Sequence, residues 1–111
     1  MSDCLFCKIL AGEIPADVVY ENEHVLAFKD IHPKTPFHVL IIPKKHIATL
    51  NDLAPEDTAL AGEIFQAAKA IADEQGFADD GYRVQMNCGE GGGQIIFHMH
   101  LHLMAGKKFS P

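Results

Sequence analysis

The stretch "FHMHLHLM", residues 97–104, places His98, His100 and His102 at every second position. Side chains of a β-strand alternate between its two faces, so this spacing predicts a strand over residues 95–103. One face, turned toward a helix and the core, would be entirely apolar and carry Ile95, Phe97, Met99, Leu101 and Leu103. The opposite, half-solvated face would carry Ile96, the three histidines and Met104.

Three histidines on one strand do not predict one metal site. A strand rises about 3.3 Å per residue, so the Cα atoms of His98 and His102 would be roughly 13 Å apart. Zinc–nitrogen bonds are only about 2.1 Å, so three imidazoles on a straight strand could not converge on one ion without severe strain. A lone histidine on a strand is usually structural, but a row of three indicates a functional site, because imidazole can act as nucleophile, base or acid near neutral pH.

The glycine-rich segment "CGEGGGQ", residues 88–94, lies directly before this row. Glycines allow the main chain to approach a ligand closely and to turn successive N–H groups toward an anion. Such a cluster by itself is more often a hairpin turn. Next to a histidine row it predicts a phosphate-binding loop beside a nucleophile.

The remaining segments predict a small α+β domain. They are a short helix over residues 4–11, strands over 17–21, 24–30, 38–43 and 81–87, and a long helix from about 55 to 75. In the long helix, Leu60, Ile64, Ala67 and Ile71 recur on one face, and Gly76 would end it. Because most strands follow one another with short links, we expect a mostly antiparallel five-stranded sheet with the long helix packed on one face.

Composition excludes several classes of protein. A chain of 111 residues suits one domain, and 48% hydrophobic with 22% charged residues is typical of a globular protein. A net charge of -6 disfavours nucleic acid as a partner. No apolar run approaches the roughly 20 residues of a membrane span, and the start "MSDCLFCK" lacks a signal-peptide layout. We therefore expect a cytoplasmic protein with reduced cysteines and no membrane partner.

Three segments carry a resemblance to a known family. The motif "HMHLHLM" is similar to the His-φ-His-φ-His-φ-φ signature of the histidine triad (HIT) superfamily, φ being apolar. Residues 6–47 ("FCKILAGEIPADVVYENEHVLAFKDIHPKTPFHVLIIPKKHI") and 81–107 ("GYRVQMNCGEGGGQIIFHMHLHLMAGK") resemble the two halves of its Hint branch, the purine nucleoside phosphoramidases. The resemblance covers about residues 3–107. It implies a single HIT domain over residues 1–111, a homodimer and purine nucleotide ligands such as AMP or GMP.

The resemblance also implies a mechanism. In the family the middle histidine, here His100, attacks the α-phosphorus of a nucleotide and forms a nucleotidyl-histidine that water then hydrolyses. A backbone carbonyl on its other ring nitrogen fixes the tautomer. His102 would contact the phosphate oxygens, and His38 matches a histidine that supports the triad. No catalytic cofactor is implied.

Further positions match the family's nucleotide site. Asp30 would accept hydrogen bonds from the ribose hydroxyls. Asn87 and the Gly93–Gln94 backbone would hold the phosphate or the leaving group. The apolar walls around the base would be Phe6, Ile9, Ile14, Phe28 and Ile31, all of which could equally be ordinary core residues.

Ile95 departs from the family pattern. Hint relatives commonly have serine or threonine after "GGQ", where the hydroxyl bonds near the leaving group, and isoleucine has no such donor. The expected activity is hydrolysis of nucleoside phosphoramidates, with dinucleoside polyphosphates as the second substrate class. A nucleotide-binding regulatory protein with little catalysis is the alternative that Ile95 favours.

Cys4 and Cys7 form a C-x₂-C pair, a spacing that offers two thiolates to one metal. The pair could also be two free cysteines in a short helix, and a protein built only for metal or redox chemistry is a third hypothesis. Some bacterial Hint-like proteins carry zinc on a Cys, Cys, His, His set, which His46 and His98 would complete here. With four protein ligands, such a zinc would be structural and would not activate water.

Overall fold

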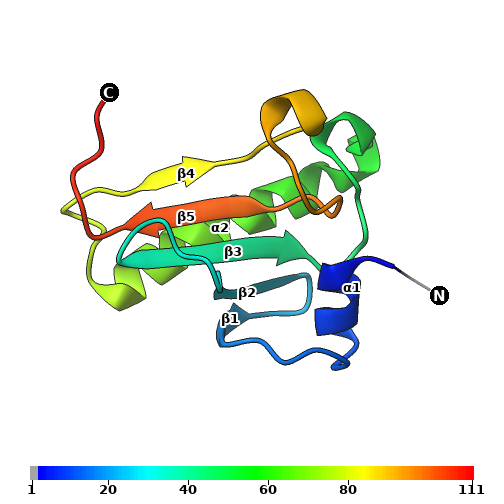
Figure 1. Cartoon of the computed structure of the whole chain (residues 1–111), viewed down its shortest axis with the longest axis horizontal. Coiled ribbons are helices and arrows are strands. Elements are labelled where there is room, and N and C mark those ends of the chain that lie inside the picture. The colour runs from blue at the N-terminus through cyan, green and yellow to red at the C-terminus, as the bar shows by residue number, and fades with distance from the viewer. Residues whose placement is uncertain (1–2) are drawn as a thin grey trace.

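The computed structural model describes residues 3–111 as one sheet with helices on both of its faces (Figure 1). The strands lie in the order β1-β2-β3-β5-β4, and each neighbouring pair is antiparallel. This confirms the predicted α+β class. The elements are α1 (Leu5–Leu10), β1 (Val18–Glu21), β2 (Val25–Lys29), β3 (Phe37–Pro43), α2 (Thr58–Gln75), β4 (Arg83–Gln85) and β5 (Leu101–Ala105), with 3₁₀ turns at Leu50–Asp52, Pro55–Asp57 and Glu90–Gly92.

The central strands are buried on both faces, because each face is covered by a different helix. Alternate residues of β2, β3 and β5 pack against α2 in the larger core, which contains Val25, Ala27, Val39, Ile41, Ile64, Ala67, Ala68, Ile71, Leu101 and Leu103. The opposite face packs against α1 through Phe6, Leu26, Phe28, Leu40 and Ile42. Since α1 has only six residues, it depends on this packing for its stability.

The long helix begins and ends where the sequence predicts. A 3₁₀ turn over Pro55–Asp57 leads into α2, and Gly76 follows it with a φ of 83°, a left-handed conformation that favours glycine. Ile64, Ala67 and Ile71 are buried in the core, as their spacing indicates. Within residues 3–111, neither helix has the combination of length and apolar character needed to cross a bilayer.

The predicted strand over residues 95–103 is wrong at its start. The ladder with β3 runs from Phe37 opposite Ala105 to Ile41 opposite Leu101 and stops there. Two positions further on in this register, Pro43 would stand opposite Met99, and proline has no N–H to donate. The Met99 amide bonds instead to the Ile47 carbonyl at 2.6 Å. Residues 95–100 therefore reach β5 as an irregular segment.

Alternation holds only in part along this stretch. Met99, Leu101 and Leu103 face the larger core as predicted. Ile95 and Phe97 were expected to join them, but they are 84% and 45% exposed because the chain has left the sheet at these positions.

Candidate active site and candidate metal site

The three histidines of the row lie on the face of the sheet that α1 covers. Their surface was expected to be half-solvated, but His98 is fully buried and His100 is only 7% exposed. The reason is Phe6 on α1, whose ring meets His100 edge-on with the ring centroids 5.2 Å apart. Phe6 also contacts Phe28 edge-on at 5.4 Å. The helix thus packs an aromatic ring against the middle histidine.

His100 is held in one tautomer. Its Nδ1 lies 2.8 Å from the carbonyl oxygen of His98, so Nδ1 must carry the proton and donate it. The other ring nitrogen, Nε2, is then left with its lone pair. Burial lowers the pKa of His100, which keeps the ring neutral at pH 7. A neutral imidazole with a free Nε2 is the form that can act as a nucleophile.

A chain of hydrogen bonds also fixes the tautomers of His38 and His102. The Lys34 main-chain N–H donates to Nδ1 of His38 at 3.1 Å, so the proton of neutral His38 sits on Nε2. That Nε2–H lies 3.0 Å from Nδ1 of His102 and donates to it. His102 therefore keeps its own proton on Nε2, where it can be donated to the acceptor of a bound ligand. Burial lowers the pKa of both rings, and that of His102 falls to about 4.

The loop that carries Lys34 is supported from the far end of β5. Gly106 has a φ of 96°, and a Cβ added there would lie 2.8 Å from the Cβ of Pro36. Glycine at this position lets the loop approach the end of β5. The Thr35 hydroxyl donates to the Phe37 carbonyl at 2.5 Å and ties the loop to the start of β3.

Asp30 lies at the edge of this histidine group. Its Oδ2 is 3.5 Å from Nε2 of His38, and its Oδ1 accepts the main-chain N–H of His32 at 2.9 Å. The Asp30 side chain is 18% exposed, which leaves the carboxylate accessible to a ligand. Asp30, His38 and His102 could in principle hold a metal by proximity. The Lys34 bond opposes this, because it keeps the proton on the ring nitrogen that would have to bind the ion.

The residues expected around a purine base divide into two kinds. Phe6 and Phe28 are buried between α1 and the sheet, and Ile9 packs against them. Ile14 and Ile9 line a cavity of about 530 Å³ beside α1. Ile31, in contrast, is 83% exposed. A second cavity of about 410 Å³ reaches Asp30 and His38. His38 is the one histidine that lines either cavity, and His100 lines neither of them.

The glycine loop differs from the predicted phosphate cradle. The amides of Gly93 and Gln94, two of the expected phosphate donors, bond inside the loop to the carbonyls of Glu90 and Gly89, both at 3.0 Å. The Gln94 side chain is 5% exposed and bonded to main-chain groups. Asn87 remains partly exposed, with its Nδ2 3.5 Å from the Gly93 carbonyl. These contacts indicate a rigid turn.

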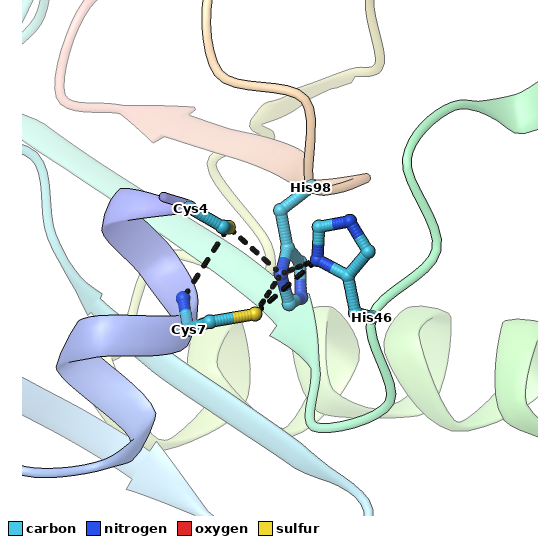
Figure 2. A group of neighbouring side chains, drawn as sticks. All are labelled: Cys4, Cys7, His46 and His98. Carbon is cyan, nitrogen blue, oxygen red and sulfur yellow. Dashed lines mark hydrogen bonds between the residues drawn. The ribbon is translucent and has the colours of Figure 1, made fainter. Parts of the chain in front are cut away.

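Cys4, Cys7, His46 and His98, here called the Cys–His group, come together from three segments (Figure 2). The two cysteines lie on and beside α1, His46 follows β3, and His98 precedes β5. Their four donor atoms all lie within 4.8 Å of one another. The Cys7 sulfur is 3.2 Å from Nδ1 of His46, and the Cys4 sulfur is 3.4 Å from Nδ1 of His98.

The chemistry of the Cys–His group fits a tetrahedral metal ion. Nε2 of His98 donates to the Pro43 carbonyl at 2.8 Å, so Nδ1 is unprotonated and points toward the sulfurs. Burial raises the pKa of the Cys4 thiol and lowers that of His98. A cation among these donors would favour the thiolate form that binds it. Two sulfurs and two imidazole nitrogens are a usual zinc ligand set.

Two contributors could not be found from residue type. Lys34 acts through its main-chain amide, which every residue except proline possesses, so sequence carries no signal for it. The sequence predicted a ligand contact for the backbone of Gln94 and none for its side chain. A polar residue directly after a run of glycines is the one sequence clue to its other contacts.

Comparison with known proteins places this arrangement in a family. A family model described as "Scavenger mRNA decapping enzyme C-term binding" matches residues 3–110. The purine nucleoside phosphoramidase of Escherichia coli (strain K12) is 43% identical over 109 residues, covering 98% of this chain and 92% of that protein. A HIT family hydrolase from Legionella pneumophila superposes with a TM-score of 0.95 at 51% identity, covering 97% and 96% of the two chains. A histidine triad protein from Clostridium difficile gives 0.96 at 45%, covering 100% and 96%.

Proposed function

The chain belongs to the histidine triad family, and from the state of His100 we propose that it hydrolyses purine nucleoside 5′-phosphoramidates through a nucleotidylated histidine. The observation that carries this proposal is the bond from Nδ1–H of His100 to the His98 carbonyl, which leaves Nε2 unprotonated in a buried, neutral ring. The similarity to a phosphoramidase of E. coli supports the substrate class.

The proposed reaction has two displacement steps. Nε2 of His100 forms a bond to the α-phosphorus, the phosphorus–nitrogen bond of the substrate breaks, and the amine leaves with a proton taken from solvent. Water then attacks the phosphorus and gives up a proton to solvent, the bond to His100 breaks, and a nucleoside monophosphate is released with the His100 ring neutral again. The Nε2–H of His102 would donate to a phosphate oxygen in both steps and stabilise the charge that develops there.

The proposed nucleotide site uses the elements around the triad. The partly exposed carboxylate of Asp30 is suited to accept hydrogen bonds from ribose hydroxyls. Phe6 and Phe28 are buried, so the apolar surface offered to a planar base is the partly exposed side chain of Ile9 that packs on them. Ile14, which lines the same cavity as Ile9, and the exposed Ile31 are the further candidates for contact with the base. Asn87, which is partly exposed, stays the candidate for the phosphate end, and the Gly93 and Gln94 amides could serve there only by giving up their bonds inside the loop.

We further propose that the Cys–His group holds a structural zinc ion. The ion would tie α1 to the segment before β5, and four protein ligands would leave no position for a reacting water. No disulfide joins Cys4, Cys7 or Cys88, which is consistent with the cytoplasmic location that we propose.

A second copy of this chain is the proposed partner. β4 is an edge strand whose Val84 is 38% exposed. Pairing of two chains through this edge would cover that side chain. Sedimentation of wild type against Val84→Glu tests the proposal, which predicts a dimer that the substitution converts to a monomer.

Mass spectrometry of the protein mixed with adenosine 5′-phosphoramidate tests the proposed reaction. We expect release of AMP and, after rapid alkaline quenching, which preserves a phosphorus–nitrogen bond, an adenylyl group on the peptide that contains His100. Binding of AMP without turnover would instead support a regulatory protein, which the exposed Ile95 favours. A parallel assay with diadenosine polyphosphates decides between the two substrate classes.

A further inference from the structure

The segment over residues 95–100 has no strand ladder to fix its position. It contains the proposed nucleophile His100 and the carbonyl of His98 that orients it, yet it lies outside the strand ladder. A main chain without ladder bonds needs other partners to hold one path, and catalytic groups must be fixed to a fraction of an ångström.

The side chain of Gln94 supplies such partners. Its Oε1 accepts the main-chain N–H of Gly89 at 2.8 Å. Its Nε2 donates to the carbonyls of Ala48 and Ile96, at 2.8 and 3.0 Å. One primary amide thus joins the glycine loop, the loop after His46 and the segment that leads to the histidines. Both of its N–H donors are used, so none is left for a ligand.

A second bond acts in parallel with Gln94. The Met99 amide donates to the carbonyl of Ile47, the residue next to Ala48. Residues 96 and 99 are therefore both attached to the same short stretch of chain, and His98 lies between the two attachments. The position of the His98 carbonyl follows from these two anchors.

We propose that Gln94 is a positioning residue for the nucleophile, whose side-chain amide takes the place of the missing ladder and sets the His98 carbonyl opposite Nδ1 of His100. This inference rests on the proposed role of His100 in catalysis. It assigns the Gln94 side chain to the protein's own main chain, in addition to any contact that its backbone makes with a nucleotide.

Two substitutions of similar size separate the bonds of Gln94. Gln94→Glu keeps an acceptor for Gly89 but loses both donors and places a carboxylate against two carbonyls. Gln94→Met fills a similar volume and makes none of the three bonds. The same changes at Gln66, which is exposed on α2, serve as matched controls. Ile64→Val leaves a small cavity in the larger core and therefore controls for a loss of stability alone.

The first measurement follows the hydrogen bonds of the Gln94 side chain by hydrogen exchange. The Gly89 amide should stay protected in Gln94→Glu and exchange faster in Gln94→Met. The Met99 amide should exchange faster in both variants, while the amides of the β3–β5 ladder should not change. Imidazole nitrogen NMR should show His100 with its proton on Nδ1 in the wild type and a mixture of tautomers in both Gln94 variants.

The second measurement is steady-state kinetics with adenosine 5′-phosphoramidate. A misplaced nucleophile should lower kcat by about ten- to a hundredfold. KM should change less than about threefold, because the apolar surface and Asp30 belong to elements that Gln94 does not touch. The Gln66 variants and Ile64→Val should retain wild-type kcat.

The outcomes distinguish this inference from the proposed function. If the wild type does not cleave the phosphoramidate but the Gln94 variants lose the His100 tautomer, the proposed function fails and the positioning role stands. If the variants keep both the tautomer and a kcat within about twofold of wild type, the positioning role is overturned. An equal loss of kcat in Ile64→Val would also overturn it, by reducing the effect to general destabilisation.

Discussion

His98 and His100 are two residues apart on the same face of the chain, yet the structure prepares them for different chemistry. His98 donates from Nε2 to the Pro43 carbonyl and turns an unprotonated Nδ1 toward two cysteines. His100 donates from Nδ1 to the His98 carbonyl and is left with a free Nε2. In each ring, the nitrogen that meets a main-chain carbonyl decides which nitrogen is available and therefore what the ring can do.

The same contrast extends to the two groups around these rings. The Cys–His group contains two sulfurs that can share a cation with the imidazoles. The second group, His38, His100 and His102, contains only rings that burial keeps neutral. One face of a sheet can therefore carry a metal site and a nucleophile side by side, provided that the main chain fixes each tautomer separately.

The largest expected effect comes from removing the proposed nucleophile, which should abolish catalysis and leave the Cys–His group intact. We expect His100→Ala to lower kcat/KM by on the order of 10³-fold or more and to abolish the adenylyl adduct. AMP binding and zinc content should remain. Because His100 packs under Phe6, the variant should also lose about 1–3 kcal/mol of unfolding free energy, which urea titration measures. Retention of more than a few per cent of kcat/KM would contradict the assignment, and the exposed His24→Ala serves as control.

Removing the thiols should affect the other group. Wild-type protein purified without chelators should contain about one zinc per chain, and Cys4→Ser/Cys7→Ser should contain almost none. Its thermal midpoint should fall by roughly 10 °C or more, because binding free energy of a structural metal is folding free energy. Cys88→Ser should keep its zinc. The proposed zinc site would be contradicted if elemental analysis found less than about 0.2 zinc per wild-type chain and if added zinc did not raise this content.

Acid should destabilise the protein through its neutral rings. The pKa of His102 is about 4 in the folded chain against 6.5 for an ordinary histidine. Between these values the unfolded chain binds a proton that the folded chain does not, so stability is complete above about pH 6.5 and declines toward pH 4. This contribution is on the order of 3 kcal/mol, and His102→Gln should lack it. Urea titrations at both pH values measure it; an unchanged difference between wild type and variant would show that His102 is not held neutral.

The smallest effect concerns the leaving group. If the absent hydroxyl limits departure of the amine, Ile95→Ser should raise kcat a few-fold for poor amine leaving groups and less for good ones. A leaving-group hydrogen bond can contribute about 10²-fold where geometry is ideal, but Ile95 lies on an exposed turn, so we expect much less. A uniform loss across a series of amines would show that this position does not act on departure.

Local patterns predicted the elements well, and tertiary contacts account for what they missed. Period-two alternation identified β5 and the facing of His100, and Gly76 marked the end of α2. The false strand over residues 95–100 arose because alternation continues in the sequence after Pro43 has ended the ladder. The burial of His100 depends on Phe6, which reaches it from the other end of the chain, and no local pattern reports such a contact.

The Cys–His group also constrains the order in which the molecule can be completed. Cys4 and His98 lie 94 positions apart, so a chain emerging from a ribosome exposes its amino terminus long before the partner of that terminus exists. A helix of six residues is not stable alone in water, and although β2 and β3 form the sheet face under α1, Phe6 also packs on His98 and His100, which are synthesised near the end of the chain. The first part of the protein to be synthesised is thus among the last to acquire its structure.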